Sequence, residues 1–305
     1  MDKKYHGIIP PIVTPIDEKE NVDEEGFRAL LERCISGGLH GIFVAGTNGE
    51  TMALTQYERN RAIKIALDQV NGRIPVVAGV MDTSTRRVIE NIKALEDMGG
   101  TCAAVTPIFY DRHTSQDETV RHFEQILKET NVDLLVYNIP PFTGLKLTPS
   151  TVIKIAELDS RVAGYKDSSG AYGEFVQVLA AYKDTPFSVM QGATPLGVTS
   201  VLMGADGFVP ALAPAFPEMF AEAYDAARSG DVELAWKYNE LIRESSKMLG
   251  MSKNATAAAK YAISLRGLTD KRVIKPQDVT TPEDEAKIRE KFAEVDAMYA
   301  ALKNS

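Results

Sequence analysis

The chain repeats one unit, in which a short apolar stretch is followed by a loop and then by an amphipathic helix. Such stretches predict eight strands: Gly7–Thr14, Gly41–Ala45, Pro75–Val80, Cys102–Thr106, Asp133–Asn138, Val162–Lys166, Phe187–Gln191 and Asp206–Pro210. They are rich in Val, Ile and Ala and alternate little between apolar and polar residues, which is typical of strands buried on both faces of a parallel sheet. No other feature of the sequence constrains the fold as strongly.

The segments between these strands contain helices with recognisable ends. Thr55 and Ser115 each have the spacing of a capping box, with a glutamate three residues further on. Thr148 and Thr281 each precede a proline, the residue favoured at the first helical position. Strands and helices are therefore expected to alternate along the chain.

Eight successive strand–helix units predict a (β/α)8 barrel. The main alternative is an open doubly wound sheet with a Gly-rich phosphate loop, and the segment Thr14–Glu18 after the first strand contains no such loop. Further helical segments are expected at Pro217–Arg228, Val232–Met248, Asn254–Leu265 and Pro282–Leu302. We expect residues 1–229 to form the barrel and residues 230–305 to form a C-terminal helical extension.

The composition disfavours several classes of function. The net charge of −8 argues against nucleic acid and anionic membranes as partners, because both require a basic face. Neither Cys34 nor Cys102 belongs to a C-x-x-C pair, and the four histidines lack ligand spacing, so we expect no metal site. No signal-like region or long apolar run is present. The expectation is a soluble, cytoplasmic protein.

The sixth predicted strand ends in Lys166, within the segment Val162–Gly170. Catalytic groups of (β/α)8 barrels lie at the C-terminal ends of the strands. Burial disfavours the ammonium form and lowers the pKa of a lysine, and a neutral amine can condense with a carbonyl to form a Schiff base. An isolated lysine more often extends its charged end to water. The residues around Lys166 alone leave both interpretations open.

Tyr137 lies near the end of the fifth predicted strand, next to the strand of Lys166. Adjacent parallel strands are about 4.8 Å apart, so the phenol and the amine could contact the same small ligand. A tyrosine hydroxyl there can transfer a proton during carbon–carbon cleavage. Taken alone, Tyr137 also fits a core aromatic whose hydroxyl has a single partner.

A polar turn with two glycines, Gly46–Glu50, follows the second predicted strand. Glycines allow backbone N–H groups to point inward and to form a nest for a carboxylate or phosphate, and Thr47 adds a hydroxyl. Turns of this composition often have no function beyond the change of chain direction. For Glu50 we expect structural hydrogen bonds.

Three motifs together carry a resemblance to a known family. They are G-T-N-G-E after the second strand, Y-N-I-P after the fifth and G-Y-K-D-S-S-G at the sixth. With the opening segment Gly7–Pro15 and the C-terminal helices, they resemble the dihydrodipicolinate synthase / N-acetylneuraminate lyase family. The resemblance implies a class I aldolase or lyase on a (β/α)8 barrel that needs no metal and no organic cofactor.

The resemblance also implies roles for individual residues. Lys166 matches the lysine that forms a Schiff base with pyruvate or another 2-keto acid, and Tyr137 matches the proton shuttle. Thr47 and Asn48 match the pair that binds the keto-acid carboxylate. Asn48 departs from the usual threonine, but a backbone contact would survive that change.

A further family tyrosine follows the fourth strand and is often contributed by a neighbouring subunit. A direct match places Phe109 at that position, whereas a small insertion in the loop would place Tyr110 there. A contact of this kind implies a homo-oligomer, either a homodimer or the dimer-of-dimers homotetramer that is typical of the family.

Two departures bear on the substrate. Dihydrodipicolinate synthases have an arginine after Tyr-Asn-x-Pro that binds the carboxylate of aspartate semialdehyde, where this chain has Phe142. N-acetylneuraminate lyases have an Asp-Glu pair after the seventh strand, where this chain has Ala193-Thr194-Pro195 after Gly192. We therefore expect cleavage of a 2-keto-3-deoxy sugar acid to pyruvate and an aldehyde, with hydroxyl contacts from Thr143, Ser168 and Gln191.

Other functions remain open at this point. The apolar Phe142 also suits a less polar aldehyde, as in hydratase-aldolases, and the synthase, sialic acid lyase and dehydratase activities of the family stay alternatives. An alternative of a different class is a catalytically idle barrel that binds a keto acid. The presence of both Lys166 and Tyr137 argues against an idle barrel.

Overall fold

The computed structural model describes residues 3–304, and its strands form one eight-stranded sheet. All neighbouring strands are parallel, in the order β1-β8-β7-β6-β5-β4-β3-β2. Their bounds are β1 (Gly7–Ile8), β2 (Ile42–Val44), β3 (Val76–Gly79), β4 (Cys102–Val105), β5 (Asp133–Asn138), β6 (Val162–Asp167), β7 (Ser188–Gln191) and β8 (Gly207–Phe208).

Backbone hydrogen bonds join the two ends of this sheet. The N–H of His40 donates to the carbonyl of Ile8 at 3.0 Å, and the N–H of Phe43 donates to the carbonyl of Pro10 at 2.9 Å. The barrel is therefore closed, and the predicted (β/α)8 fold is confirmed. The predicted first strand was too long, because Pro10 and Pro11 have no N–H and cannot complete a strand ladder.

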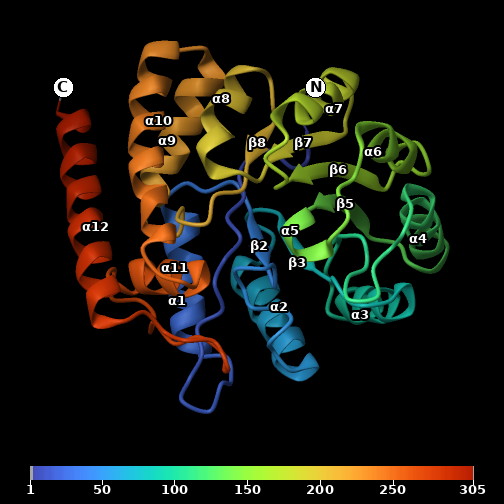
Figure 1. Cartoon of the computed structure of the whole chain (residues 1–305), viewed down its shortest axis with the longest axis horizontal. Helices are drawn as coiled ribbons and strands as arrows, with labels where there is room; N and C mark the ends of the chain where they lie inside the picture. Colours follow the sequence, from blue (N-terminus) through green and yellow to red (C-terminus); the bar gives the residue numbers. More distant parts are fainter. Residues whose placement is uncertain (1–2, 305) are drawn as a thin grey trace.

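Eight helices follow the strands and surround the barrel (Figure 1). They are α1 (Glu24–Ser36), α2 (Gln56–Val70), α3 (Thr85–Asp97), α4 (Gln116–Glu129), α6 (Pro149–Ala156), α7 (Tyr172–Tyr182), α8 (Gly197–Leu202) and α9 (Pro217–Ser229). Shorter helical turns, α5 (Pro140–Thr143) and η1 (Thr194–Leu196), lie in the loops after β5 and β7.

All four predicted helix caps are present, but one of the two predicted capping boxes is incomplete. Ser115 forms a complete capping box, and Thr148 and Thr281 cap their helices. Thr55 caps α2, but the carboxylate of Glu58 accepts a hydrogen bond from the N–H of Val22 at 2.6 Å instead of returning to the cap. The capping box predicted there is therefore only half formed.

The C-terminal extension packs on the barrel helices. It contains α10 (Val232–Ser246), η2 (Lys247–Gly250), α11 (Ala255–Ser264) and α12 (Pro282–Lys303), and Figure 1 shows α12 beside α10 at one edge of the molecule. The rings of Phe216 and Phe292 lie 4.7 Å apart, so apolar contacts cross the boundary expected at residue 229. That boundary stays a prediction. Among the described helices, none is both long and apolar enough to cross a membrane.

Alternate residues of the strands face two separate apolar layers. One layer fills the barrel interior and includes Ile9, Phe43, Val77, Ala104, Leu135, Tyr137, Met190 and Val209. The other lies between the sheet and the helices. Because side chains alternate along a strand, a shift of one residue would exchange the two sets.

One glycine allows β3 to approach the turn after β2. A Cβ atom added to Gly79 would lie 2.0 Å from the carbonyl oxygen of Ala45, which has a left-handed φ of 52°. We predict that Gly79→Ala lowers the free energy of unfolding by about 1–3 kcal/mol, as overpacking does. Gly173→Ala, which meets open space in α7, is the control and should change it by less than about 1 kcal/mol. Equal urea midpoints for the two variants would contradict this prediction.

Candidate active site

Strand β6 places Lys166 inside the barrel, near the C-terminal ends of the strands. The residue is 6% exposed, and its Nζ lies 4.5 Å from the ring centroid of Phe43 and 3.9 Å from that of Tyr137. None of the ion pairs in the described part of the chain includes Lys166. Burial lowers the pKa of Lys166, and the phenol of Tyr137 opposes this effect only in part. The amine is therefore set up to be a nucleophile.

Tyr137 is the partner of Lys166 in the register between β5 and β6. It is 2% exposed, and its ring packs edge-on against Phe43 with the centroids 5.9 Å apart. The phenol and the amine thus face the same interior space from adjacent strands. This is the proximity that proton transfer to or from a ligand on the amine requires.

The next residues along the two strands, Asn138 and Asp167, face away from the barrel interior. The amide of Asn138 donates to the carboxylate of Asp167 at 2.9 Å. Asp167 also accepts from the backbone N–H of Ser169 at 3.1 Å and from its hydroxyl at 2.9 Å. These contacts fix the loops after β5 and β6, and so hold the two inward-facing side chains in place.

The turn Gly46–Glu50 presents unpaired donors. Ala45 and Glu50 have left-handed φ values of 52° and 56°, which make the turn compact. The N–H groups of Thr47 and Asn48 donate to no acceptor among residues 3–304. The side-chain nitrogen of Asn48 is buried and likewise lacks an acceptor in the described structure. Such a group of donors can bind an anion.

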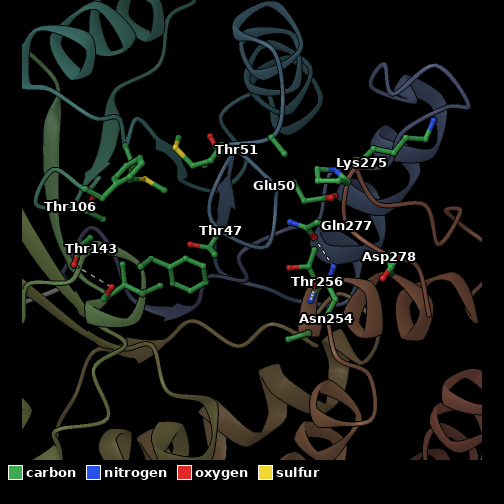
Figure 2. A pocket seen from close by; sticks show the side chains of 18 of the residues that line it. Thr47, Glu50, Thr51, Thr106, Thr143, Asn254, Thr256, Lys275, Gln277 and Asp278 are labelled. Atoms are coloured by element: carbon green, nitrogen blue, oxygen red, sulfur yellow. Dashed lines mark hydrogen bonds between the residues drawn. The ribbon is translucent and has the colours of Figure 1, made fainter. Parts of the chain in front are cut away.

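A cavity of about 840 Å³ opens above the C-terminal ends of β2 to β5. Figure 2 shows Thr47 between two walls, with Thr106 and Thr143 on one side and Asn254, Thr256 and Gln277 of the C-terminal extension on the other. Ile139, which also lines the cavity, follows Tyr137 by two residues, so Tyr137 and Lys166 lie one layer deeper. The volume is in the range that holds a ligand much larger than a three-carbon acid.

Phe43 and the wall from the extension were not predicted. Phe43 lies in a short apolar run whose sequence does not distinguish inward from outward residues. Asn254 and Gln277 are far from the strand ends in sequence, and the side-chain hydrogen bond of 2.6 Å between them forms only in the folded chain. No local signal could have found them.

Of the two predicted hydroxyl groups, only that of Thr143 belongs to a residue that lines the cavity. Thr143 lines it, but its buried hydroxyl donates to the carbonyls of Leu145 at 3.0 Å and Ile139 at 3.3 Å. The hydroxyl of Ser168 lies against Gly192, where an added Cβ would come within 2.1 Å of it.

Gln191 is held on the other side of the sheet. It pairs in register with Asp167, not with Lys166. Its amide donates to the hydroxyl of Ser200 at 3.3 Å and accepts from the N–H of Ala193 at 2.8 Å. These contacts occupy both polar atoms of the Gln191 amide within the protein. They argue against the predicted contact of Gln191 with a substrate hydroxyl.

The loop after β4 distinguishes Phe109 from Tyr110. Phe109 lines the cavity, whereas Tyr110 is 97% exposed and has a left-handed φ of 71°. The guanidinium of Arg112, from the same loop, lies over Gly144, where an added Cβ would be 2.7 Å from Nη1. An arginine is therefore present near Phe142, although none follows the Y-N-I-P motif.

A buried lysine near a barrel strand end, beside a phenol, is the arrangement that a Schiff-base nucleophile requires. The chain belongs to the Dihydrodipicolinate synthetase family, whose model matches residues 4–295. The protein is a lyase, and the class I aldolase mechanism is typical of its family.

Curated relatives and a solved structure agree with this assignment. A 4-hydroxy-tetrahydrodipicolinate synthase of Methanopyrus kandleri is 34% identical over 77% of this chain and 78% of its own. An uncharacterized DapA-like lyase of Thermofilum pendens is 32% identical over 80% and 81%. YagE of E. coli K12, a prophage protein of the dihydrodipicolinic acid synthase family solved with pyruvate, has a TM-score of 0.91 at 27% identity, covering 96% and 99%.

The pKa of Lys166 can be tested by reductive methylation with formaldehyde, followed by site-resolved mass spectrometry. The rate depends on the neutral amine, so the midpoint of its pH dependence should lie below the ordinary value of 10.5, because burial disfavours the ammonium. A lysine-containing peptide serves as the reference. A midpoint at or above that of the peptide would show that Lys166 is not perturbed.

Proposed function

We propose that the protein is a class I aldolase that reversibly cleaves a 2-keto acid to pyruvate and an aldehyde. The observation that carries this proposal is the buried amine of Lys166, which has no ion-pair partner among residues 3–304 and lies 3.9 Å from the centroid of the Tyr137 ring. The pyruvate complex of YagE, which shares the fold, supports it.

The chemistry follows from these positions. The amine of Lys166 attacks the keto carbon, water leaves, and a protonated imine forms. The bond between C3 and C4 then breaks, its electron pair moves toward the iminium nitrogen to give an enamine, and Tyr137 relays the proton of the C4 hydroxyl. The aldehyde leaves, the enamine takes a proton at C3, and hydrolysis returns pyruvate and Lys166. The N–H groups of Thr47 and Asn48 hold the carboxylate throughout.

A 2-keto-3-deoxy sugar acid is our proposed substrate class. The cavity of about 840 Å³ leaves room beyond the pyruvate portion. Its outer wall carries Asn254, Thr256, Gln277 and Asp278, which can hydrogen-bond hydroxyl groups. Of the residues expected from the sequence, Thr143 and Ser168 stay candidates for contacts with substrate hydroxyls.

One observation favours a second function. The guanidinium of Arg112 lies over Gly144, close to the position where dihydrodipicolinate synthases of the family have an arginine. Arg112 could bind the carboxylate of aspartate semialdehyde from a different loop. Condensation of pyruvate with that aldehyde is therefore the alternative activity, and the name of the Methanopyrus kandleri relative agrees with it.

We further propose that the protein acts as a homo-oligomer, a homodimer or a dimer-of-dimers homotetramer. We expect Tyr110 to contact a second copy of the chain. It is 97% exposed and follows Phe109, which lines the cavity.

The first test is trapping with pyruvate and borohydride. We predict an irreversible mass gain on Lys166 of the wild-type protein and no gain in Lys166→Ala, because the imine must form on that amine. A screen then compares cleavage of 2-keto-3-deoxy acids, N-acetylneuraminate and 4-hydroxy-2-oxoglutarate with condensation of aspartate semialdehyde. If no keto acid gives an adduct, the aldolase proposal is wrong and the alternative of an idle barrel that binds a keto acid is favoured. If condensation with aspartate semialdehyde is efficient, the proposed substrate class of sugar acids is wrong.

Tyr137→Phe tests the proton relay. The substitution keeps the ring that packs against Phe43 but removes the hydroxyl, so turnover should fall by about 10²–10⁴-fold while the fold is retained. Circular dichroism and the urea midpoint serve as the control for folding. Unchanged turnover on the substrate found in the screen would return Tyr137 to a purely structural role.

A further inference from the structure

The carboxylate of Glu50 is bound by two separate segments of the C-terminal extension. It forms an ion pair with Lys260 of α11, in which the side chains are 1% and 0% exposed respectively. Its Oε1 also accepts a hydrogen bond from the N–H of Ile274 at 2.8 Å. Lys260 donates in addition to the carbonyl of Arg272 at 2.7 Å. The contacts join one residue of the turn after β2 to a region more than 200 positions later in the chain.

Stability alone does not explain this arrangement. Burying two charges has a high desolvation cost, and apolar residues of similar size often stabilise a fold as well as a buried ion pair does. A hydrogen-bonded buried pair does, however, have a narrow range of allowed geometries. The ion pair with Lys260 therefore fixes the position of the Glu50 side chain.

The position of Glu50 fixes the turn that carries the anion-binding donors. Glu50 has a left-handed φ of 56°, which a residue other than glycine keeps only when its surroundings hold it there. Its own N–H donates to the carbonyl of Thr47 at 3.0 Å. Movement of Glu50 would therefore also move the N–H groups of Thr47 and Asn48. Figure 2 shows Glu50 on the same side of the cavity as Lys275 and Gln277.

We propose that Lys260 is a positioning residue that acts through Glu50. It holds the turn Gly46–Glu50 in the conformation that presents its N–H groups to the carboxylate of the 2-keto acid. The C-terminal extension thereby sets the affinity of the site for its keto-acid substrate. This inference rests on the function proposed above.

The test is borohydride trapping over a range of pyruvate concentrations. In Lys260→Met, we expect the pyruvate concentration for half-maximal adduct formation to rise about ten-fold or more, since small displacements of a binding group have effects of this size or larger. At saturating pyruvate the adduct on Lys166 should still form completely. A general loss of folded protein would lower the maximal amount of adduct. It would not be reversed by a higher pyruvate concentration.

The chain offers a matched control. Lys3 forms a buried ion pair with Asp206 at 2.9 Å, with side chains 8% and 7% exposed. Asp206 immediately precedes β8, so this pair lies at the opposite end of the barrel from the proposed site. Lys3→Met should lower stability and leave the half-maximal pyruvate concentration unchanged.

Lys260→Met leaves the buried carboxylate of Glu50 unpaired and can fail to fold. In that case the double variant Glu50→Gln/Lys260→Met, which keeps an acceptor for Ile274 but removes both charges, is measured in its place. The proposal would be overturned if the variant that folds had the same half-maximal pyruvate concentration as the wild type. It would also be overturned if Lys3→Met raised that concentration as much as the Lys260 variant does. No adduct on the wild-type protein would instead overturn the proposed function, and this inference with it.

Discussion

Burial of an amine without a counter-ion is the constraint on which the site depends. Lys166 and Lys260 are both buried, and burial lowers the pKa of both. Only Lys260 has a carboxylate, that of Glu50, which opposes the effect of desolvation. Lys166 instead faces the rings of Phe43 and Tyr137, whose attraction for a cation is weaker than that of a full negative charge. The same fold thus contains one lysine suited to structure and one suited to reaction.

Strand geometry separates Lys166 from the carboxylate nearest to it in sequence. A carboxylate, that of Asp167, follows immediately in the sequence, but successive side chains of a strand point to opposite faces. Asp167 therefore lies outside the barrel interior, where Asn138 and Ser169 satisfy its oxygens. The register between β5 and β6 places Tyr137 beside Lys166 and Asn138 beside Asp167. The same register therefore places Lys166 and Tyr137 inside the barrel. It places the hydrogen bonds of Asn138 and Asp167, which fix these strands, outside the barrel.

The sequence predicted the barrel, and it singled out Lys166, Tyr137 and Thr47, because both the fold and these motifs depend on local patterns. Strand runs, helix caps and the motifs around Thr47, Tyr137 and Lys166 are each contained within a few residues. The errors arose where a contact depends on the folded chain. Gln191 ends β7, and Lys166 lies one residue before the end of β6. Gln191 pairs in register with Asp167, however, so its side chain faces away from the barrel interior and contacts Ser200. The contact of Lys260 with the turn after β2 could not be read from either segment alone, although a lysine inside an alanine-rich helix was a signal that it needed a partner.

The candidate site has an inner half, the layer of Lys166 and Tyr137, and an outer half, the cavity above it, and the two are built in different ways. The inner half depends on strand register, which cannot change at one residue without exchanging the two faces of the strand. The outer half is lined by loop residues such as Phe109 and Phe142. Arg112, in the same loop as Phe109, approaches Gly144 so closely that any side chain there would displace it. Gly144 also has a left-handed φ of 68°, which favours glycine on its own account. A single substitution at Gly144 would therefore move a cationic group of the loop after β4 without touching Lys166. Residues of such loops can therefore change while the strand register that holds Lys166 and Tyr137 stays the same.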